Sequence, residues 1–196
     1  LFNFKSQSLS VDVSLHIGSF LAIIFYFKND LFNFFKNKGL FIKIFIASIP
    51  TIIVGYILVR FNLIDQLRNL KVIGWTTLIF GLLLYFADRF KNIKKIKDLS
   101  YNSVLFIGLF QVLSLLPGVS RSGVSITAAR LLKFKRVDSA KISFLLSVPT
   151  LAAISFYGIY NVVNEESLEF SFLNLLSIFL SFNFSLITIT YFIKYI

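Results

Sequence analysis

The stretch "LLPGVSRSGVS", residues 115–125, interrupts a long apolar sequence with a proline, two glycines, three serines and one arginine. Pro117 ends a helix, because it has no N–H and disfavours helical backbone in the residue before it. Gly118 and Gly123 permit turns and close backbone approach. The stretch therefore predicts a turn between two helical arms, and the charge of Arg121 on that turn requires an explanation.

The composition is that of a membrane protein. Hydrophobic residues make up 57% of the 196 residues, Phe occurs 25 times and the mean hydropathy is +0.81, whereas a soluble domain is about 45–50% apolar. The apolar residues fall into blocks near the length that crosses a bilayer, roughly 20 residues. These blocks cover residues 11–27, 39–61, 72–87, 104–132, 142–163 and 170–193.

Counts of single residue types exclude some kinds of site. The chain has no Cys, so disulfides and thiolate metal sites are excluded, and its one His excludes a multi-histidine metal site within one chain. The net charge of +11 is explained by loop lysines, since basic residues of membrane proteins concentrate on the cytoplasmic side. We therefore expect no nucleic-acid partner.

The loop charges predict how the chain is threaded. Most of the Lys and Arg lie in loops at residues 28–38, 88–98 and 133–141, so these loops are assigned to the cytoplasm. The acidic turn 165–169 falls on the opposite side. Because two cytoplasmic loops flank the block 104–132, this block must enter the membrane and return.

Each half of that block is too short to cross a membrane alone at about 1.5 Å per residue. We expect a re-entrant helical hairpin at about residues 104–132. The predicted fold class is all-α: a polytopic integral membrane protein with about five spanning helices and one hairpin, forming a single membrane domain over residues 1–196. The segments "FIASIPT" (45–51) and "FLLSVPT" (144–150) are similar to each other, which suggests a duplication, and both predict proline-containing helices.

The tip of the hairpin has the residues of an anion site. Ser120 or Ser122 is expected to cap the second arm, leaving free N–H groups that point into a cavity. A helix N-terminus with hydroxyls and a guanidinium binds anions, and the fork of an arginine matches phosphate. The alternative is a kinked helix whose Arg121 extends to the membrane interface, but it leaves the proline, glycines and serines without a role. We predict that Arg121 binds phosphate.

Two further residues are weaker candidates. Gln111 lies ten residues before Arg121 on the first arm and is assigned to substrate binding, although a hydrogen bond between helices explains it equally well. His16, near the start of the first apolar block, is either a catalytic residue or a buried, hydrogen-bonded histidine. No acidic residue falls in the middle of an apolar block beside Arg121, so the chain has a phosphate site without an obvious general base.

The sequence resembles a known family over nearly its whole length. Residues 107–150, "IGLFQVLSLLPGVSRSGVSITAARLLKFKRVDSAKISFLLSVPT", resemble the second signature region of the undecaprenyl-diphosphate phosphatases, the bacitracin-resistance phosphatases. Residues 11–31, "VDVSLHIGSFLAIIFYFKNDL", resemble the segment that follows the first signature. The resemblance implies a multi-pass protein of the bacterial inner membrane, built as an inverted repeat. It implies release of phosphate from undecaprenyl diphosphate, which regenerates the lipid carrier of peptidoglycan synthesis.

The resemblance also implies roles for the residues of the tip. At the matching positions Arg121 and Ser120 would be catalytic, while Ser122, Gly123 and Ser125 would bind the diphosphate. The family commonly has Thr where this chain has Ser125, which keeps the hydroxyl.

The chain departs from the family at its ends. The first signature of the family carries paired glutamates and a Ser–Ser–x–x–His-type stretch, which supply acid–base groups and a divalent-ion site for Mg²⁺ or Ca²⁺. Nothing in "LFNFKSQSLS", residues 1–10, matches it, the final span of the family is missing after Ile196, and the sequence has no Met. We expect the interior of a longer protein, with no metal ligands in this chain and little activity for these residues alone.

Two other functions remain open. A polyprenyl-phosphate transporter or flippase also suits a broken helix whose N-terminus faces an anion. A purely structural subunit would leave Arg121 unexplained. A homodimer is compatible with the sequence.

Overall fold

The computed structural model describes residues 9–29, 31–32, 38–61, 63, 69–90, 93–164 and 172–195, and in these ranges the chain is helical apart from loops and one isolated β-bridge. The helices are α1 (Leu9–Tyr26), α3 (Lys38–Arg60), α5 (Leu70–Ala87), α6 (Tyr101–Val112), α7 (Arg121–Leu131), α8 (Arg136–Asn164) and α9 (Phe172–Tyr195), with short 3₁₀ turns η1 (Ile96–Asp98) and η2 (Leu113–Leu115). The predicted all-α class is confirmed. The acidic turn 165–169 and residues 33–37 of the first basic loop lie outside the described residues.

Four described helices are long and apolar enough to cross a membrane: α3, α5, α9 and the part of α8 at Arg136–Tyr160. They correspond to four of the five predicted spans. The fifth, predicted at 11–27, is the shorter apolar helix Ser10–Tyr26. At about 1.5 Å per residue it is roughly 25 Å long, somewhat less than a hydrocarbon core of about 30 Å.

The described chain divides into two compact units, Leu1–Asn33 with Val148–Ile196, and Phe34–Ser147. Helix α8 contributes to both, and the division falls beside Pro149 in its interior. The other similar segment places Pro50 inside α3, so both segments are proline-containing helices as predicted. The single membrane domain and the duplication stay predictions.

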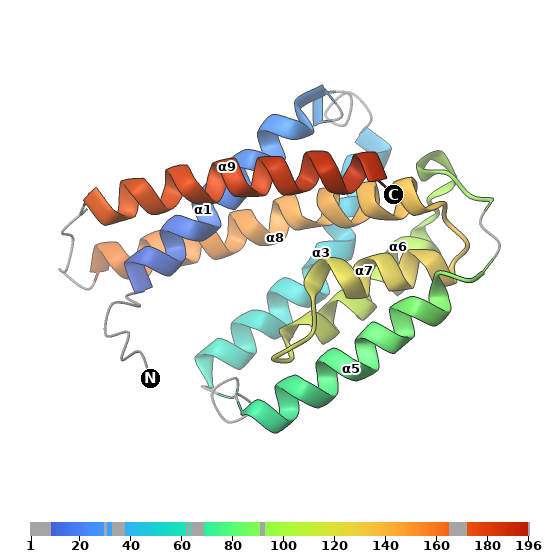
Figure 1. The fold of residues 1–196 in the computed structure, drawn as a ribbon, viewed down its shortest axis with the longest axis horizontal. Coiled ribbons are helices and arrows are strands. Elements are labelled where there is room, and N and C mark those ends of the chain that lie inside the picture. The colour runs from blue at the N-terminus through green and yellow to red at the C-terminus, as the bar shows by residue number, and fades with distance from the viewer. Residues whose placement is uncertain are drawn as a thin grey trace. The chain divides into compact units, whose positions relative to one another are not determined.

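In the first unit α1 and α9 lie side by side (Figure 1). A Cβ added to Gly18 would lie 2.8 Å from Cβ of Ser181, so the two helices can touch at this point because Gly18 has no side chain. Next to it, the Ser19 hydroxyl lies 2.9 Å from that of Ser181 and 3.1 Å from that of Ser185. Small residues and hydroxyl contacts of this kind hold helices together in membranes, where apolar side chains give no preference for protein over lipid.

In the second unit α3 packs against α6 in the same way. A Cβ added to Gly108 would lie 2.9 Å from Cα of Ala47 and closer still to its carbonyl oxygen, so the two backbones are in direct contact. Farther along, Gly55 of α3 faces the side chain of Leu115, with its added Cβ 3.5 Å from Cδ2. The residue later in α3, Gly55, contacts the residue later in the first arm of the hairpin, Leu115. The helices α3 and α6 therefore run in the same direction.

The close contact at Gly108 gives a direct test of this packing. Replacing Gly108 with Ala should lower the free energy of unfolding by about 1–3 kcal/mol, because the new methyl group forces the two backbones apart. The matched control is Gly81→Ala on α5, where a Cβ meets nothing within 4 Å. The control should be neutral or slightly stabilising, since Ala favours helix over Gly by about 1 kcal/mol. Thermal unfolding in detergent measures both, and equal melting temperatures for the two variants would contradict the packing.

Candidate functional site

The predicted hairpin is present. Helices α6 and α7 pack against each other, joined by η2 and a turn (Figure 1). The chain segments before α6 and after α7 also lie side by side: the N–H groups of Ile93 and Lys94 donate to the carbonyl of Lys133, and the N–H of Lys135 donates to that of Lys94. The two basic loops therefore meet, and the chain reverses its direction between them as a hairpin. Re-entry into a membrane stays a prediction.

The tip of the hairpin is fixed to α5. The hydroxyl of Thr76 donates to the carbonyl of Pro117 at 2.6 Å, and the hydroxyl of Thr77 donates to the carbonyl of Gly118 at 3.0 Å. Gly118 has a φ of +89°, and a Cβ there would lie 2.6 Å from the carbonyl oxygen of Ile73. Only glycine meets both conditions, because a side chain would be strained by the backbone angle and would collide with α5.

The second arm begins at the predicted cap. Ser120, in an extended conformation, is the N-cap of α7, and its hydroxyl oxygen accepts a hydrogen bond from the N–H of Gly123 at 3.2 Å. The hydroxyl of Ser122 lies 3.3 Å from that of Ser120, and both serines are exposed. Arg121 is the first residue of the helix and is half-buried. Four of the predicted site residues thus share one helical turn whose remaining N–H groups face the helix end.

Ser125 lies one turn further and is buried. Its hydroxyl donates to the carbonyl of Arg121 at 2.7 Å, and the hydroxyl of Thr127 donates to that of Gly123 at 2.7 Å. From α8, the hydroxyl of Ser143 donates to the carbonyl of Ser122 at 3.4 Å. These bonds hold the first turn of α7 from inside. A role for Ser125 in binding substrate stays a prediction.

The two weaker candidates lie on other helices, α6 and α1. Gln111 is on α6 and is completely buried, and neither its Nε2 nor its Oε1 has a hydrogen-bond partner among the described residues. His16 is exposed on α1, in the other compact unit. Gln111 therefore belongs to the same compact unit as Arg121, and its role in substrate binding stays a prediction. The catalytic role of His16 also stays a prediction.

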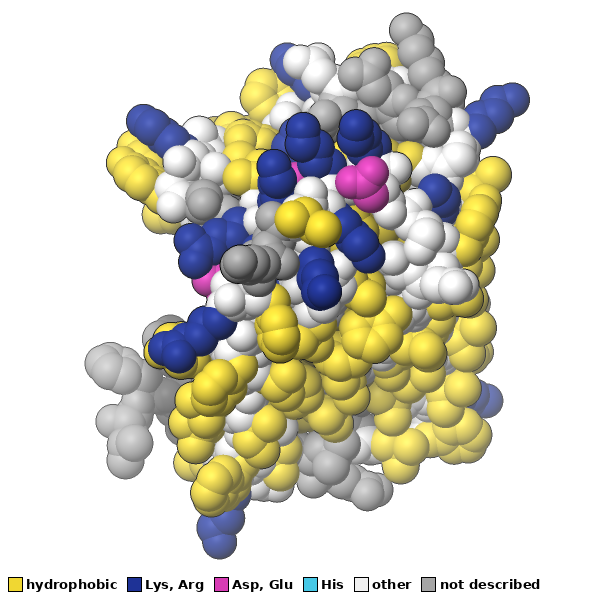
Figure 2. Space-filling model, turned by 90° about the vertical axis from the view of Figure 1, so that its right-hand side faces the viewer, with side chains coloured by type: hydrophobic (Ala, Val, Ile, Leu, Met, Phe, Trp, Pro, Cys, Tyr) yellow, Lys and Arg dark blue, Asp and Glu magenta, His cyan; other side chains and the backbone are white. Residues whose placement is uncertain are grey.

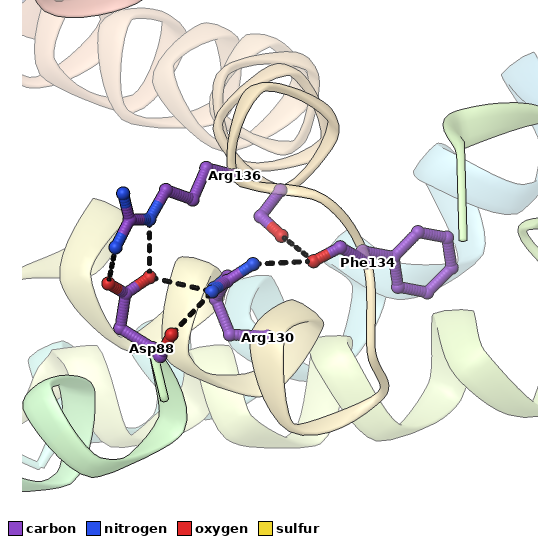
Figure 3. Close-up of polar contacts among 5 residues, drawn as sticks. Asp88, Arg130, Phe134 and Arg136 are labelled. Carbon is purple, nitrogen blue, oxygen red and sulfur yellow. Dashed lines mark hydrogen bonds and ion pairs between the residues drawn. The ribbon is translucent and has the colours of Figure 1, made fainter. Parts of the chain in front are cut away.

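The sequence analysis missed a second cation, Arg130, near the end of α7. Arg130 is 2% exposed. Its Nη2 lies 2.8 Å from Oδ1 of Asp88 and donates to the Asp88 carbonyl at 2.6 Å, while its Nη1 donates to the carbonyl of Phe134 at 3.0 Å. Figure 3 shows Asp88 held between Arg130 and Arg136, whose Nε donates to the same carboxylate at 3.0 Å. The sequence did contain a signal for this ion pair: Arg130 lies within an apolar block, and Asp88 lies at the edge of another.

This group of Asp88, Arg130 and Arg136, the base clamp, links the end of α5 to the end of α7 and the start of α8. Hydrogen bonding to Arg136 holds the pKa of the Asp88 carboxyl below its ordinary value, helped by the charge of Arg130 and opposed by partial burial. The clamp fixes the base of the hairpin while α5 fixes its tip.

Basic side chains surround the base clamp. Figure 2 shows Lys and Arg side chains gathered on one part of the face, next to a broad hydrophobic surface. The basic residues of the two joined loops are Arg89, Lys94, Lys95, Lys97, Lys133, Lys135 and Arg136. Such a boundary between basic and apolar surface is typical of the cytoplasmic rim of a membrane protein.

Metal ligands do not gather in the described part of the chain: no group of three or more His, Cys, Asp or Glu side chains is close enough to hold an ion.

The base clamp gives a matched pair of variants. Arg130→Gln should destabilise the protein by about 3 kcal/mol or more, because it removes a buried cation that bonds the Asp88 carboxylate and donates to the carbonyls of Asp88 and Phe134. Arg136→Gln removes a bond to the same carboxylate from a side chain that is 58% exposed, and should cost much less, because solvent screens an exposed ion pair. Thermal unfolding of both variants measures this difference, and a larger loss for Arg136→Gln would contradict the assigned roles.

The lowered pKa of Asp88 predicts a pH dependence. Because the folded-state pKa lies below the unfolded value, the carboxylate stabilises the fold above about pH 4, and this contribution is lost as pH falls through the folded-state pKa. Asp88→Asn should have a lower melting temperature than the parent protein at pH 7, and this difference in melting temperature should shrink below about pH 4. A difference that stays constant down to pH 3 would show that the charge of Asp88 adds nothing.

Comparison with known proteins shows the family to which the chain belongs. The family model described as "Bacitracin resistance protein BacA" matches residues 1–196. The undecaprenyl-diphosphatase of Pelagibacter ubique is 50% identical over 198 residues, covering 100% of this chain and 77% of the relative. That of Saccharophagus degradans is 37% identical over 182 residues, covering 86% and 68%, and that of Ruegeria pomeroyi is 39% identical over 163 residues, covering 76% and 61%. The chain belongs to the BacA family of bacitracin resistance proteins.

Proposed function

We propose that this chain carries the phosphate-binding part of an undecaprenyl-diphosphatase, which converts undecaprenyl diphosphate to undecaprenyl phosphate and free phosphate in the recycling of the lipid carrier for cell-wall synthesis. Bacitracin resistance follows from the same activity. The observation that carries the proposal is the start of α7, where Ser120 caps the helix and Arg121 is its first residue, at the tip of a hairpin. The similarity to undecaprenyl-diphosphatases over the whole chain supports it.

In this reaction the bond between the terminal phosphorus and the bridging oxygen breaks, and an oxygen from water ends on the released phosphate. Negative charge moves onto the bridging oxygen as the bond breaks. The guanidinium of Arg121 donates two parallel hydrogen bonds to the oxygens of the terminal phosphate. The N–H groups at the start of α7 stabilise the same charge, because they are fixed before the substrate arrives.

Ser120 orients the phosphate. Its oxygen accepts the N–H of Gly123, so its own proton is available for a phosphate oxygen, with the Ser122 hydroxyl 3.3 Å away as a second donor. Activation of the attacking water needs a base. Asp88, Asp98 and Asp138 of this unit lie at the base of the hairpin, with the length of α7, roughly 16 Å, between them and the tip. We therefore assign substrate binding and charge stabilisation to the tip of the hairpin. The general base that activates water is assigned to other residues.

The setting of the reaction is part of the proposal. The four candidate spans and the basic loops at the hairpin base support a multi-pass protein of the bacterial inner membrane with these loops in the cytoplasm. The lipid substrate then reaches the tip within the bilayer. A divalent cation and a second copy of the chain are further parts of the proposal. No reaction step is assigned to the cation, since the described residues bring no set of ligands together.

One observation favours a second function, transport of a polyprenyl phosphate. The tip presents a helix N-terminus whose first residue is an arginine, and this arrangement also suits a carrier that binds an anion without cleaving it. A full-length protein that moves the lipid across vesicles and releases no phosphate would establish transport in place of hydrolysis.

The role of the arginine fork is tested in the full-length protein by the rate of phosphate release from undecaprenyl diphosphate in detergent. Arg121→Ala should abolish release, and Arg121→Lys should lose about tenfold or more, because an ammonium cannot donate two parallel bonds. The control is Arg89→Lys, an exposed arginine of the basic loop, which should keep its rate. Near-normal release by Arg121→Lys would mean that charge alone is needed, and normal release by Arg121→Ala would contradict the proposal.

A further inference from the structure

Two buried polar side chains of the second unit make no hydrogen bond with the described part of the chain. Gln111 of α6 is 0% exposed and Thr51 of α3 is 6% exposed. Neither the amide of Gln111 nor the hydroxyl of Thr51 has a hydrogen-bond partner in the described part of the chain. An unpaired buried polar group lowers stability, and an apolar side chain of the same shape would avoid this loss.

The two side chains lie at the same level between α3 and α6. The helices run in the same direction, with Ala47 against Gly108 at one contact and Gly55 against Leu115 at the next. Thr51 is midway between Ala47 and Gly55 along α3, and Gln111 of α6 is close to midway between Gly108 and Leu115, which lies in η2. At the first contact the backbones touch, while at the second the Leu115 side chain lies between them, so the two backbones are farther apart toward the hairpin tip.

Thr51 lacks the local bond that its neighbour makes. The hydroxyl of Ser48, one turn earlier on α3, donates to the carbonyl of Ile44 at 3.0 Å, which is the usual bond of a helical serine or threonine to the residue four positions back. The corresponding carbonyl for Thr51 is that of Ala47, which lies against Gly108. The hydroxyl of Thr51 is therefore left for a group other than its own helix.

We propose that Gln111 and Thr51 form an uncharged site that binds an oxygen atom, supplied either by the substrate diphosphate or by a water molecule held beside it. This inference rests on the proposed function. Gln111 lies five residues before the end of the first arm at Leu116, roughly 8 Å along the helix axis. Its amide and the threonine hydroxyl offer hydrogen bonds without charge, which suits the phosphate next to the apolar chain, while Arg121 binds the more highly charged terminal phosphate.

The test uses the full-length protein in detergent and a methylene-bridged polyprenyl diphosphate, which is not hydrolysed. The variants are Thr51→Val and Gln111→Met, which keep shape and remove the polar atoms. The matched control is Ser48→Ala, which removes a buried hydroxyl that is already bonded within α3. Melting temperature without lipid and affinity for the lipid are measured for each. We expect each variant to melt at or above the parent temperature and to bind the lipid about tenfold more weakly, with the control unchanged in affinity.

Each outcome decides the inference. Weaker lipid binding assigns the oxygen to the diphosphate, whereas unchanged binding with a lower melting temperature assigns it to a structural water. Unchanged binding with an equal or higher melting temperature overturns the inference. Thr51→Val keeps the test decisive where Gln111→Met does not fold. Arg121→Ala separates the two proposals, because lipid binding that survives in that variant contradicts the proposed function and not the site at Gln111 and Thr51.

Discussion

The hairpin depends on one constraint: the backbone carbonyls of its irregular tip must have hydrogen-bond partners. Thr76 and Thr77 of α5 supply them by donating to Pro117 and Gly118. Because the carbonyls are bonded on one side of the turn, the chain can reverse and begin α7 with its N–H groups directed outward. The proposed anion site thus depends on how the turn is held.

The base of the hairpin is held separately, by charge. Asp88 accepts from Arg130 and Arg136, and the two basic loops are joined through backbone hydrogen bonds. With both ends fixed, the first turn of α7 is preorganised, so a bound phosphate meets donors that need not move. Stability at the base and binding at the tip are therefore different properties of one hairpin, and variants at the two ends should separate them.

Features that depend on neighbouring residues could be predicted from the sequence. The proline and glycine of residues 117–118 and the flanking basic loops predicted the hairpin, and the serine pattern predicted the cap of α7. The contacts of Arg130 with Asp88 and of Thr77 with Gly118 join residues about 40 positions apart, and no local pattern encodes such a pairing. The unpaired amide of Gln111 was also beyond the sequence, because burial without a partner is a property of packing.

The central claim is that the start of α7 binds the phosphate of a polyprenyl lipid. An experimental structure of the full-length protein with undecaprenyl phosphate bound tests it most directly. The account predicts a phosphate within hydrogen-bond distance, about 3 Å, of the Arg121 guanidinium and of the N–H groups of the first turn of α7. A phosphate bound elsewhere, with Arg121 paired to a protein carboxylate instead, would contradict it.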